Sequence, residues 1–271
     1  MNVILLHLVP ASAYALLGFI LWRSLRIDKP SGKAALSTLA RTLLLTGLIT
    51  HGYVLSTDML DGNMLHFGLA IALSLTLWLA LLLYFTESLV TRIDSLLLLA
   101  SLPAAICAAL PAFMPGTLHI NIEAWALRLH FAVAMLAYSF FALAALHSVM
   151  MWVAERQLHR AHLNEGLGLP PLLMLERMLF RLIGIAFVFL TLTALSGLLF
   201  SEESIGRPMT LKYKLGFTIA AWLVFGILLI GRHFRGWRGR VAQRWTLLGF
   251  VFLFLAYAGT HFVLEVMLKR S

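Results

Sequence analysis

Residues 128–147 read RLHFAVAMLAYSFFALAALH, an almost continuous apolar run with a histidine near each end. A run of about 20 apolar residues is long enough for an α-helix to cross the hydrocarbon of a bilayer. An ionisable ring in such a helix must be paired, hydrated or bound to a ligand. The stretch therefore predicts a membrane-spanning helix, and it raises the question of what His130 and His147 do.

Similar apolar runs recur along the whole chain. Of the 271 residues, 61% are hydrophobic and only 12% are charged, whereas soluble domains are about a quarter charged. We expect an all-α fold, a polytopic membrane helical bundle that forms a single transmembrane domain over residues 1–271. Its eight predicted transmembrane helices cover 3–23, 37–57, 64–86, 95–113, 127–152, 182–200, 213–231 and 245–267.

The loops between these spans alternate in charge. Basic residues follow the first, fifth and seventh spans, in segments 23–33, 156–181 and 232–244. Positive loops stay in the cytoplasm, so both termini are predicted to lie outside. The net charge of +9 is then explained by orientation and by contact with the lipid bilayer, and it does not indicate nucleic-acid binding. Residues 172–181, LLMLERMLFR, predict a short separate helix at the inner interface.

This topology gives each histidine a depth. Residues His130 and His147 are 17 positions apart, about 25 Å along a helix, so they cannot share a ligand. Six histidines gather toward the outer face, and four lie toward the inner face. The outer six are His7, His51, His66, His119, His130 and His261, and the inner four are His147, His159, His162 and His233.

The pair at similar depth on two different helices is His130 and His261. Two neutral imidazoles from facing helices can supply both axial ligands of a haem iron. Arg128 is placed to bind a haem propionate. His51 and His66 either join this site or line its approach. The alternative for any one of these histidines is an interfacial ring that meets water and headgroups.

Classical enzyme chemistry has no support in the sequence, which contains no phosphate loop, nucleophile elbow or zinc-protease signature. A respiratory di-haem cytochrome b is also disfavoured. That design needs ligands near both faces on each of two partner helices, and the last predicted span has only His261.

Three stretches resemble the cytochrome c assembly (CcsA/CcmC-like) family of integral membrane proteins. They are LHFAVAMLAYSFFALAAL at 129–146, LERMLFRLIGIAFVFLTLTALSG at 175–197 and AYAGTHF at 256–262. The segment LLIGRHFRGWRGRVAQRW at 228–245 is most similar to the HemX-like branch of that family. The resemblance covers residues 60–268.

The resemblance implies haem handling at the outer face of the bacterial inner membrane, with haem b as the cofactor. Residues His130 and His261 match the two family histidines that flank a tryptophan-rich outer loop. The corresponding segment here, FSEESIGRPMTLKYKLG at 200–216, contains no tryptophan. The implied role is therefore a haem carrier or chaperone rather than a complete synthase.

A second function class stays open. HemX-like relatives imply a regulatory or scaffold protein without haem chemistry. Such a protein would act through a membrane or cytoplasmic partner at the basic inner segments 153–181 and 232–244.

Overall fold

The computed structural model describes residues 3–27, 38–61, 64–90, 93–114, 118–121, 124–159, 170–201 and 208–259. Within these residues the chain forms eight α-helices, three short strands and two irregular helical turns. The helices are α1 (Val3–Ile27), α2 (Thr38–Met59), α3 (Leu69–Ser88), α4 (Asp94–Ala109), α5 (Trp125–His159), α6 (Leu172–Ser201), α7 (Pro208–Arg235) and α8 (Gly239–Phe254). The strands are β1 (Leu60–Asp61), β2 (Met64–Phe67) and β3 (Leu118–Asn121), and the turns are the 3-10 helix η1 (Leu110–Ala112) and the π-helix η2 (Leu255–Gly259).

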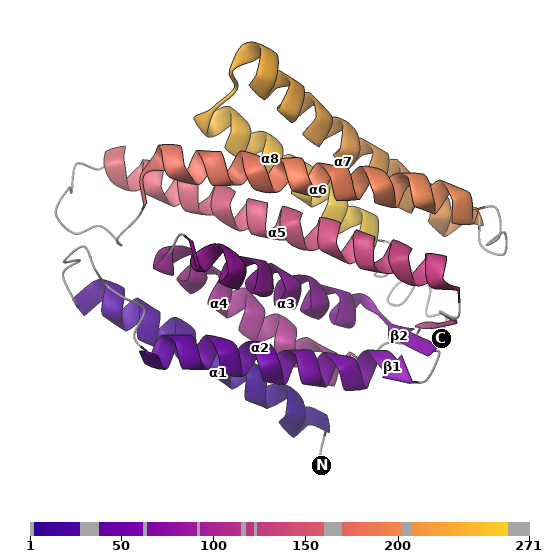
Figure 1. Ribbon diagram of the computed structural model, residues 1–271, viewed down its shortest axis with the longest axis horizontal. Helices are drawn as coiled ribbons and strands as arrows, with labels where there is room; N and C mark the ends of the chain where they lie inside the picture. Colours follow the sequence, from indigo (N-terminus) through magenta and orange to yellow (C-terminus); the bar gives the residue numbers. More distant parts are fainter. Residues whose placement is uncertain are drawn as a thin grey trace.

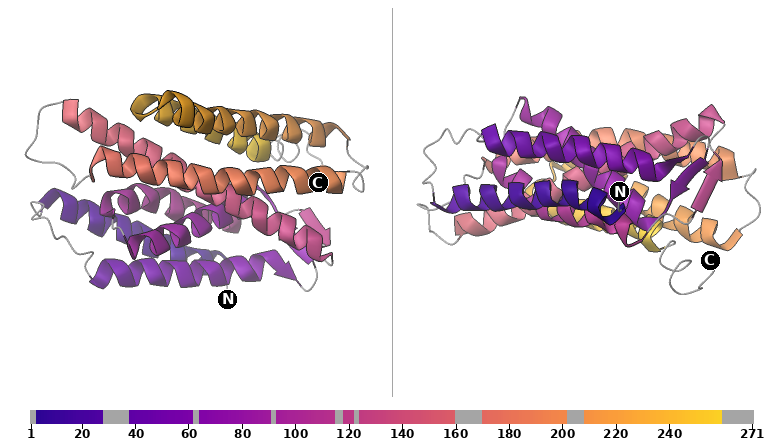
Figure 2. Two further views of the ribbon diagram at one scale, coloured as in Figure 1. Left: turned by 45° about the horizontal axis from the view of Figure 1, so that its top comes forward. Right: turned by 90° about the horizontal axis from the view of Figure 1, so that it is seen from below.

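Helix α5 is the centre of the bundle. It packs against α3 and α4 on one side and against α6 and α8 on the other. Figure 1 shows α1–α4 below α5 and α6–α8 above it. In the right view of Figure 2, which looks from below, α1 and α2 lie in front. Successive helices run in opposite directions, so the N-terminal end of α5 lies beside β2, and its C-terminal end lies beside the α7–α8 turn.

Each of the eight predicted spans overlaps one of these helices, which confirms the helical architecture, and residues 260–267 of the last span lie outside the described residues. Among the described residues, six helices are long and apolar enough to cross a membrane, namely α1, α3, α4 continued by η1, α5, α6 and α7. Helix α2 is rich in threonine and polar residues, and α8 has only 16 residues. The count of eight crossings and the outer location of the termini therefore stay predictions.

Several predicted boundaries differ from the structure by five residues or more, and two of these differences change an interpretation. Residues 172–181 are not a separate interfacial helix but the first turns of α6, because apolar residues continue at helical spacing without a break. There the Glu176 carboxylate is buried and accepts a hydrogen bond from Arg232 Nη1 at 2.6 Å. The third span begins at Leu69 and not at residue 64, because Gly68 is extended (φ −169°) and the preceding residues form a strand.

The strands form a small antiparallel sheet, in the order β1-β2-β3, at one end of the bundle. Leu60 pairs with Leu65, and His66 stands opposite His119 in the register of β2 and β3. We call this region, residues 60–67 and 118–130, the sheet end. The opposite region, residues 152–159 and 232–244, is called the basic end.

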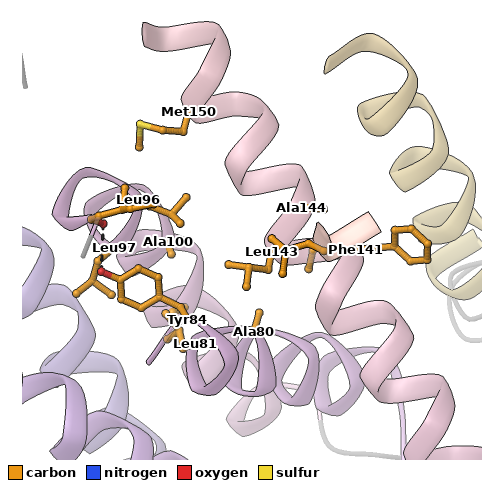
Figure 3. Packing of buried hydrophobic residues seen from close by; sticks show 14 of the residues in the cluster. Ala80, Leu81, Tyr84, Leu96, Leu97, Ala100, Phe141, Leu143, Ala144 and Met150 are labelled. Carbon is orange, nitrogen blue, oxygen red and sulfur yellow. Dashed lines mark hydrogen bonds between the residues drawn. The ribbon is translucent and has the colours of Figure 1, made fainter. Parts of the chain in front are cut away.

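The main core lies along α5 and its neighbours. Phe141 is fully buried and stacks on Phe225 of α7, with ring centroids 3.9 Å apart. Figure 3 shows the α3–α4–α5 side, where Tyr84 Oη donates to the Ile93 carbonyl at 3.1 Å. Small residues at the contacts allow close helix approach, as is common in membrane bundles; in Figure 3 they are Ala80, Ala100 and Ala144.

The turn between α7 and α8 is short and closely packed. Gly236 (φ 65°) and Gly239 (φ 53°) adopt left-handed backbone conformations that favour glycine. The Trp237 ring packs directly on Gly231, where a Cβ atom would collide with the indole. Glu176 of α6 contacts this turn through Arg232 and through the Gly239 amide, which donates to Oε2 at 3.4 Å. One carboxylate thus ties α6 to the α7–α8 turn.

Candidate functional site

His130 lies on the second turn of α5, at the sheet end, and is partly buried. Its Nδ1 lies 2.7 Å from Ser196 Oγ on α6. The Ser196 hydroxyl also lies within hydrogen-bond distance of the Leu192 carbonyl, at 2.8 Å. When the hydroxyl donates its one proton to that carbonyl, Oγ accepts from His130 Nδ1–H, and the neutral ring has its lone pair on Nε2.

Aromatic rings gather next to His130. The neighbouring Phe131 meets Phe67 of β2 edge to face, with centroids 5.6 Å apart. Phe67 in turn meets Tyr257 of η2 at 6.0 Å. The Tyr257 hydroxyl donates to the Gly68 carbonyl at 3.1 Å and holds η2 against the start of α3. These rings form a small apolar cluster that is separate from the main core.

The fold does not bring all the other predicted site residues together. Arg128 is exposed, half a turn before His130 on α5. His66 is on β2 and not on α3, because the third span begins later than predicted. His261 lies outside the described residues, so its predicted pairing with His130 stays a prediction.

His51 does not contact the His130 region. It is buried in α2, where its Nε2 lies 2.7 Å from Ser74 Oγ of α3, and its ring meets Tyr14 of α1 edge to face. Helix α2 packs with α1 and α3, whereas Ser196 lies on α6, on the other side of α5. The structure thus gives His51 a position inside the α1–α4 half.

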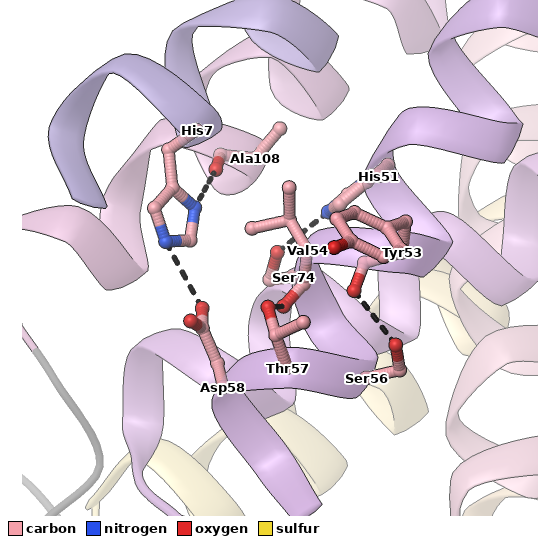
Figure 4. A network of polar contacts seen from close by, with 9 residues as sticks. All are labelled: His7, His51, Tyr53, Val54, Ser56, Thr57, Asp58, Ser74 and Ala108. Atoms are coloured by element: carbon pink, nitrogen blue, oxygen red, sulfur yellow. Dashed lines mark hydrogen bonds and ion pairs between the residues drawn. The ribbon is translucent and has the colours of Figure 1, made fainter. Parts of the chain in front are cut away.

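Sequence reasoning missed a second buried pair in the same half. In Figure 4, His7 of α1 and Asp58 of α2 point toward each other, with Nε2 and Oδ2 3.0 Å apart. The other ring nitrogen, Nδ1, donates to the Ala108 carbonyl of α4 at 3.0 Å. The sequence could have indicated this pair through Asp58, the one acidic residue in α2. A carboxylate in an apolar helix needs a partner.

His147 is fully buried at the other end of α5. Its Nδ1 donates to the Leu143 carbonyl one turn earlier at 3.0 Å. That nitrogen lies 3.7 Å from Glu87 Oε2 of α3. The geometry places His147 in a helix-to-helix contact, distinct from the His130 site, as the depth argument predicted.

Among the described residues, histidine, cysteine, aspartate and glutamate side chains form no group of three that could hold a metal ion. A site with one or two protein ligands, of the kind that an axially bound haem iron uses, is compatible with this arrangement.

The six long apolar helices define a multi-pass membrane protein. The model of the cytochrome c assembly protein family matches residues 7–268. The chain belongs to that family, which confirms the resemblance seen in its histidine-bearing segments.

Two bacterial relatives cover a large part of the chain. The inner membrane protein YpjD of Escherichia coli K12 is 33% identical over 169 residues, which are 60% of this chain and 62% of YpjD. A 28.8 kDa protein of Azospirillum brasilense is 30% identical over 214 residues, 75% of this chain and 77% of the relative. The match to YpjD thus spans less than two thirds of that protein.

A third relative is the cytochrome c biogenesis protein CcsA of the alga Heterosigma akashiwo. It is 33% identical over 92 residues, 34% of this chain and 29% of CcsA. No solved structure matches the chain.

Proposed function

We propose that this protein handles haem in the bacterial inner membrane, as a carrier or chaperone rather than as a complete cytochrome c synthase. Haem b would be held at the sheet end, with its iron between His130 and His261 and a propionate near Arg128. The family match and the inner-membrane location in the name of the YpjD relative support this proposal.

The observation that carries the proposal is the hydrogen bond from His130 Nδ1 to Ser196 Oγ. An imidazole that binds a metal through one nitrogen usually donates its other N–H to a nearby acceptor, which fixes the tautomer and the ring orientation. Ser196 can provide that acceptor when its own proton is donated to the Leu192 carbonyl. In that arrangement His130 has the tautomer that an iron ligand at Nε2 requires.

The surroundings also fit a porphyrin. Phe131, Phe67 and Tyr257 provide an apolar aromatic wall beside His130. If His261 releases the iron, the haem would be held by His130 alone and could be passed to another protein. A carrier needs such a releasable ligand. In this scheme Ser196 holds the ring, and the aromatic wall excludes water.

The composition of segment 200–216 is the reason why we propose a carrier and not a complete synthase. It contains no tryptophan, so it has no indole platform on which a porphyrin could be presented to an apocytochrome. We therefore assign binding and delivery, not covalent attachment, to this chain.

The test is an absorption spectrum of the detergent-purified protein after addition of haem. The wild type should show a sharp low-spin b-type band. A His130→Ala, His261→Ala double variant should lose it, because both axial ligands are removed. The control is His233→Ala, which removes an exposed histidine at the basic end and should leave the band unchanged.

A wild-type protein that takes up no haem would overturn the proposal. The alternative function would then be preferred, a regulatory or scaffold protein that acts through a partner at the basic segments 153–181 and 232–244. The observation that favours this alternative is the missing tryptophan in segment 200–216.

A further inference from the structure

A cleft of about 530 Å³ opens at the basic end, between the last turns of α5 and the first turns of α8. Three guanidinium groups line it, from Arg156, Arg240 and Arg244, together with a single carboxylate, that of Glu155. The Trp152 ring forms part of its wall. This cleft is far from the histidines of the sheet end, at the other end of α5.

The carboxylate of the cleft is already neutralised. Arg240 Nε donates to Glu155 Oε1 at 2.6 Å, and Gln243 Nε2 approaches Oε2 at 3.5 Å. The cleft therefore has an excess of positive charge, contributed by Arg156 and Arg244, both exposed. An excess of guanidinium groups in a concave site favours an anion, because the planar fork binds two oxygens of a phosphate at once.

A neighbouring cleft on the other side of Gln243 has fewer guanidinium groups. The second cleft, of about 310 Å³, contains the carboxylates of Glu155 and Glu176 but only one guanidinium, that of Arg238. Both carboxylates of the second cleft are paired, Glu155 with Arg240 and Glu176 with Arg232, so this cleft carries no excess of negative charge. The first cleft is the more basic of the two, because three guanidinium groups line it and only one lines the second.

The walls of the first cleft are held in place. Arg156 lies over the Trp152 ring, with its Cζ 3.7 Å from the ring centroid, a distance typical of a cation–π contact. Gln243 is buried, and its backbone carbonyl accepts a hydrogen bond from Ser148 Oγ of α5 at 3.1 Å. This bond joins α5 and α8 directly beneath the cleft.

The position of the cleft indicates what kind of anion reaches it. Trp152 and Arg156 lie at the end of the apolar span 125–157, the level at which tryptophan and arginine meet lipid headgroups. Basic pockets between membrane helices at this depth accommodate the phosphates of anionic lipids. Leu247 extends the lining with an apolar side chain, so the cleft offers both a polar and an apolar surface.

We propose that the Arg156–Arg240–Arg244 cleft between α5 and α8 binds the phosphodiester headgroup of an anionic phospholipid. The lipid phosphate contacts Arg156 and Arg244, and its glycerol and upper acyl chain lie along Trp152 and Leu247. Because α5 also carries His130, the bound lipid braces the basic end of the helix that positions the candidate haem site. This binding does not depend on the proposed haem function.

The test is a titration of the detergent-purified full chain with phosphatidylglycerol, followed by native mass spectrometry. Phosphatidylcholine serves as the zwitterionic lipid, and inorganic phosphate as the soluble anion. We expect phosphatidylglycerol to bind about tenfold more tightly than phosphatidylcholine, since hydrogen bonds between charged groups are the strong ones. Arg156→Gln, Arg244→Gln should weaken phosphatidylglycerol binding by about tenfold.

The matched control is Arg177→Gln, Arg235→Gln, which removes two exposed arginines on α6 and α7 that line neither cleft. This control should change phosphatidylglycerol binding by less than about twofold. Equal losses in the two double variants, or no loss in the first, would overturn the proposal. Release of phosphatidylglycerol by a few millimolar inorganic phosphate would identify a soluble-anion site instead and would also overturn it.

Discussion

The two ends of α5 hold the same side chain in different surroundings. At the sheet end, His130 is partly buried, and its Nδ1–H bonds across to Ser196 on another helix. At the basic end, His147 is fully buried, its Nδ1–H bonds to its own helix, and its Nε2 faces Glu87. The position of the first ring thus depends on α5–α6 packing, whereas the second ring holds α5 to α3.

The largest expected effect is on stability, from His147→Leu. This change leaves the partly buried Glu87 carboxylate without its imidazole neighbour, and we expect a loss of about 2–3 kcal/mol in the free energy of unfolding. His130→Leu should lose less than about 1 kcal/mol. Unfolding in mixed micelles measures both values.

A double variant separates charge from packing at this end. Combining His147→Leu with Glu87→Gln removes the carboxylate charge and should restore about half of the lost stability. An equal loss of stability in His130→Leu and His147→Leu would contradict the proposed difference between the two ends of α5.

The next effect is on haem affinity, from Ser196→Ala. The variant keeps His130 but removes the acceptor of its Nδ1–H, so the affinity for added haem should fall by about 10- to 100-fold. Thr193→Ala is the matched control, because the Thr193 hydroxyl bonds only to Phe189 of its own helix, at 2.8 Å. Spectral titration with haem measures the difference, and equal affinities of the two variants would contradict the role given to Ser196.

The smallest effect is expected from Arg128→Gln. Arg128 is exposed, so its attraction for a propionate is screened by water and salt, and haem affinity should fall by no more than about fivefold. The loss should shrink as salt is raised, because screening weakens the contact in the wild type. A salt-independent loss in the same titration would show that Arg128 acts through packing instead.

Most of the fold was predictable because hydropathy is a local property. Each apolar run predicted one helix, and turn residues separated the runs. The sheet was missed because β1, β2 and β3 have two, four and four residues, too few to give a clear alternating pattern. The α6 extension was missed because Glu176 looks interfacial in sequence, although Arg232 of α7 allows it to be buried.

The candidate site was predictable only in part. The predicted depth in the membrane correctly placed His130 and His147 at opposite ends of one helix, since distance along a helix follows from residue number. Depth could not say which helices are neighbours, so it grouped His51 with His130 although they lie in different halves. The contacts with Ser196, Asp58 and Glu87 join residues far apart in sequence, and helix packing alone determines them.

The α7–α8 turn has a consequence for biosynthesis. Only three residues separate Arg235 from Gly239, so we expect the two helices to enter the membrane together as one hairpin. Until they do, the Glu176 carboxylate on α6 lacks Arg232 and Arg238, and an unpaired buried carboxylate is costly. Insertion of the hairpin brings the two arginines to the carboxylate, so a nascent chain that stops before α7 carries an unpaired carboxylate on α6.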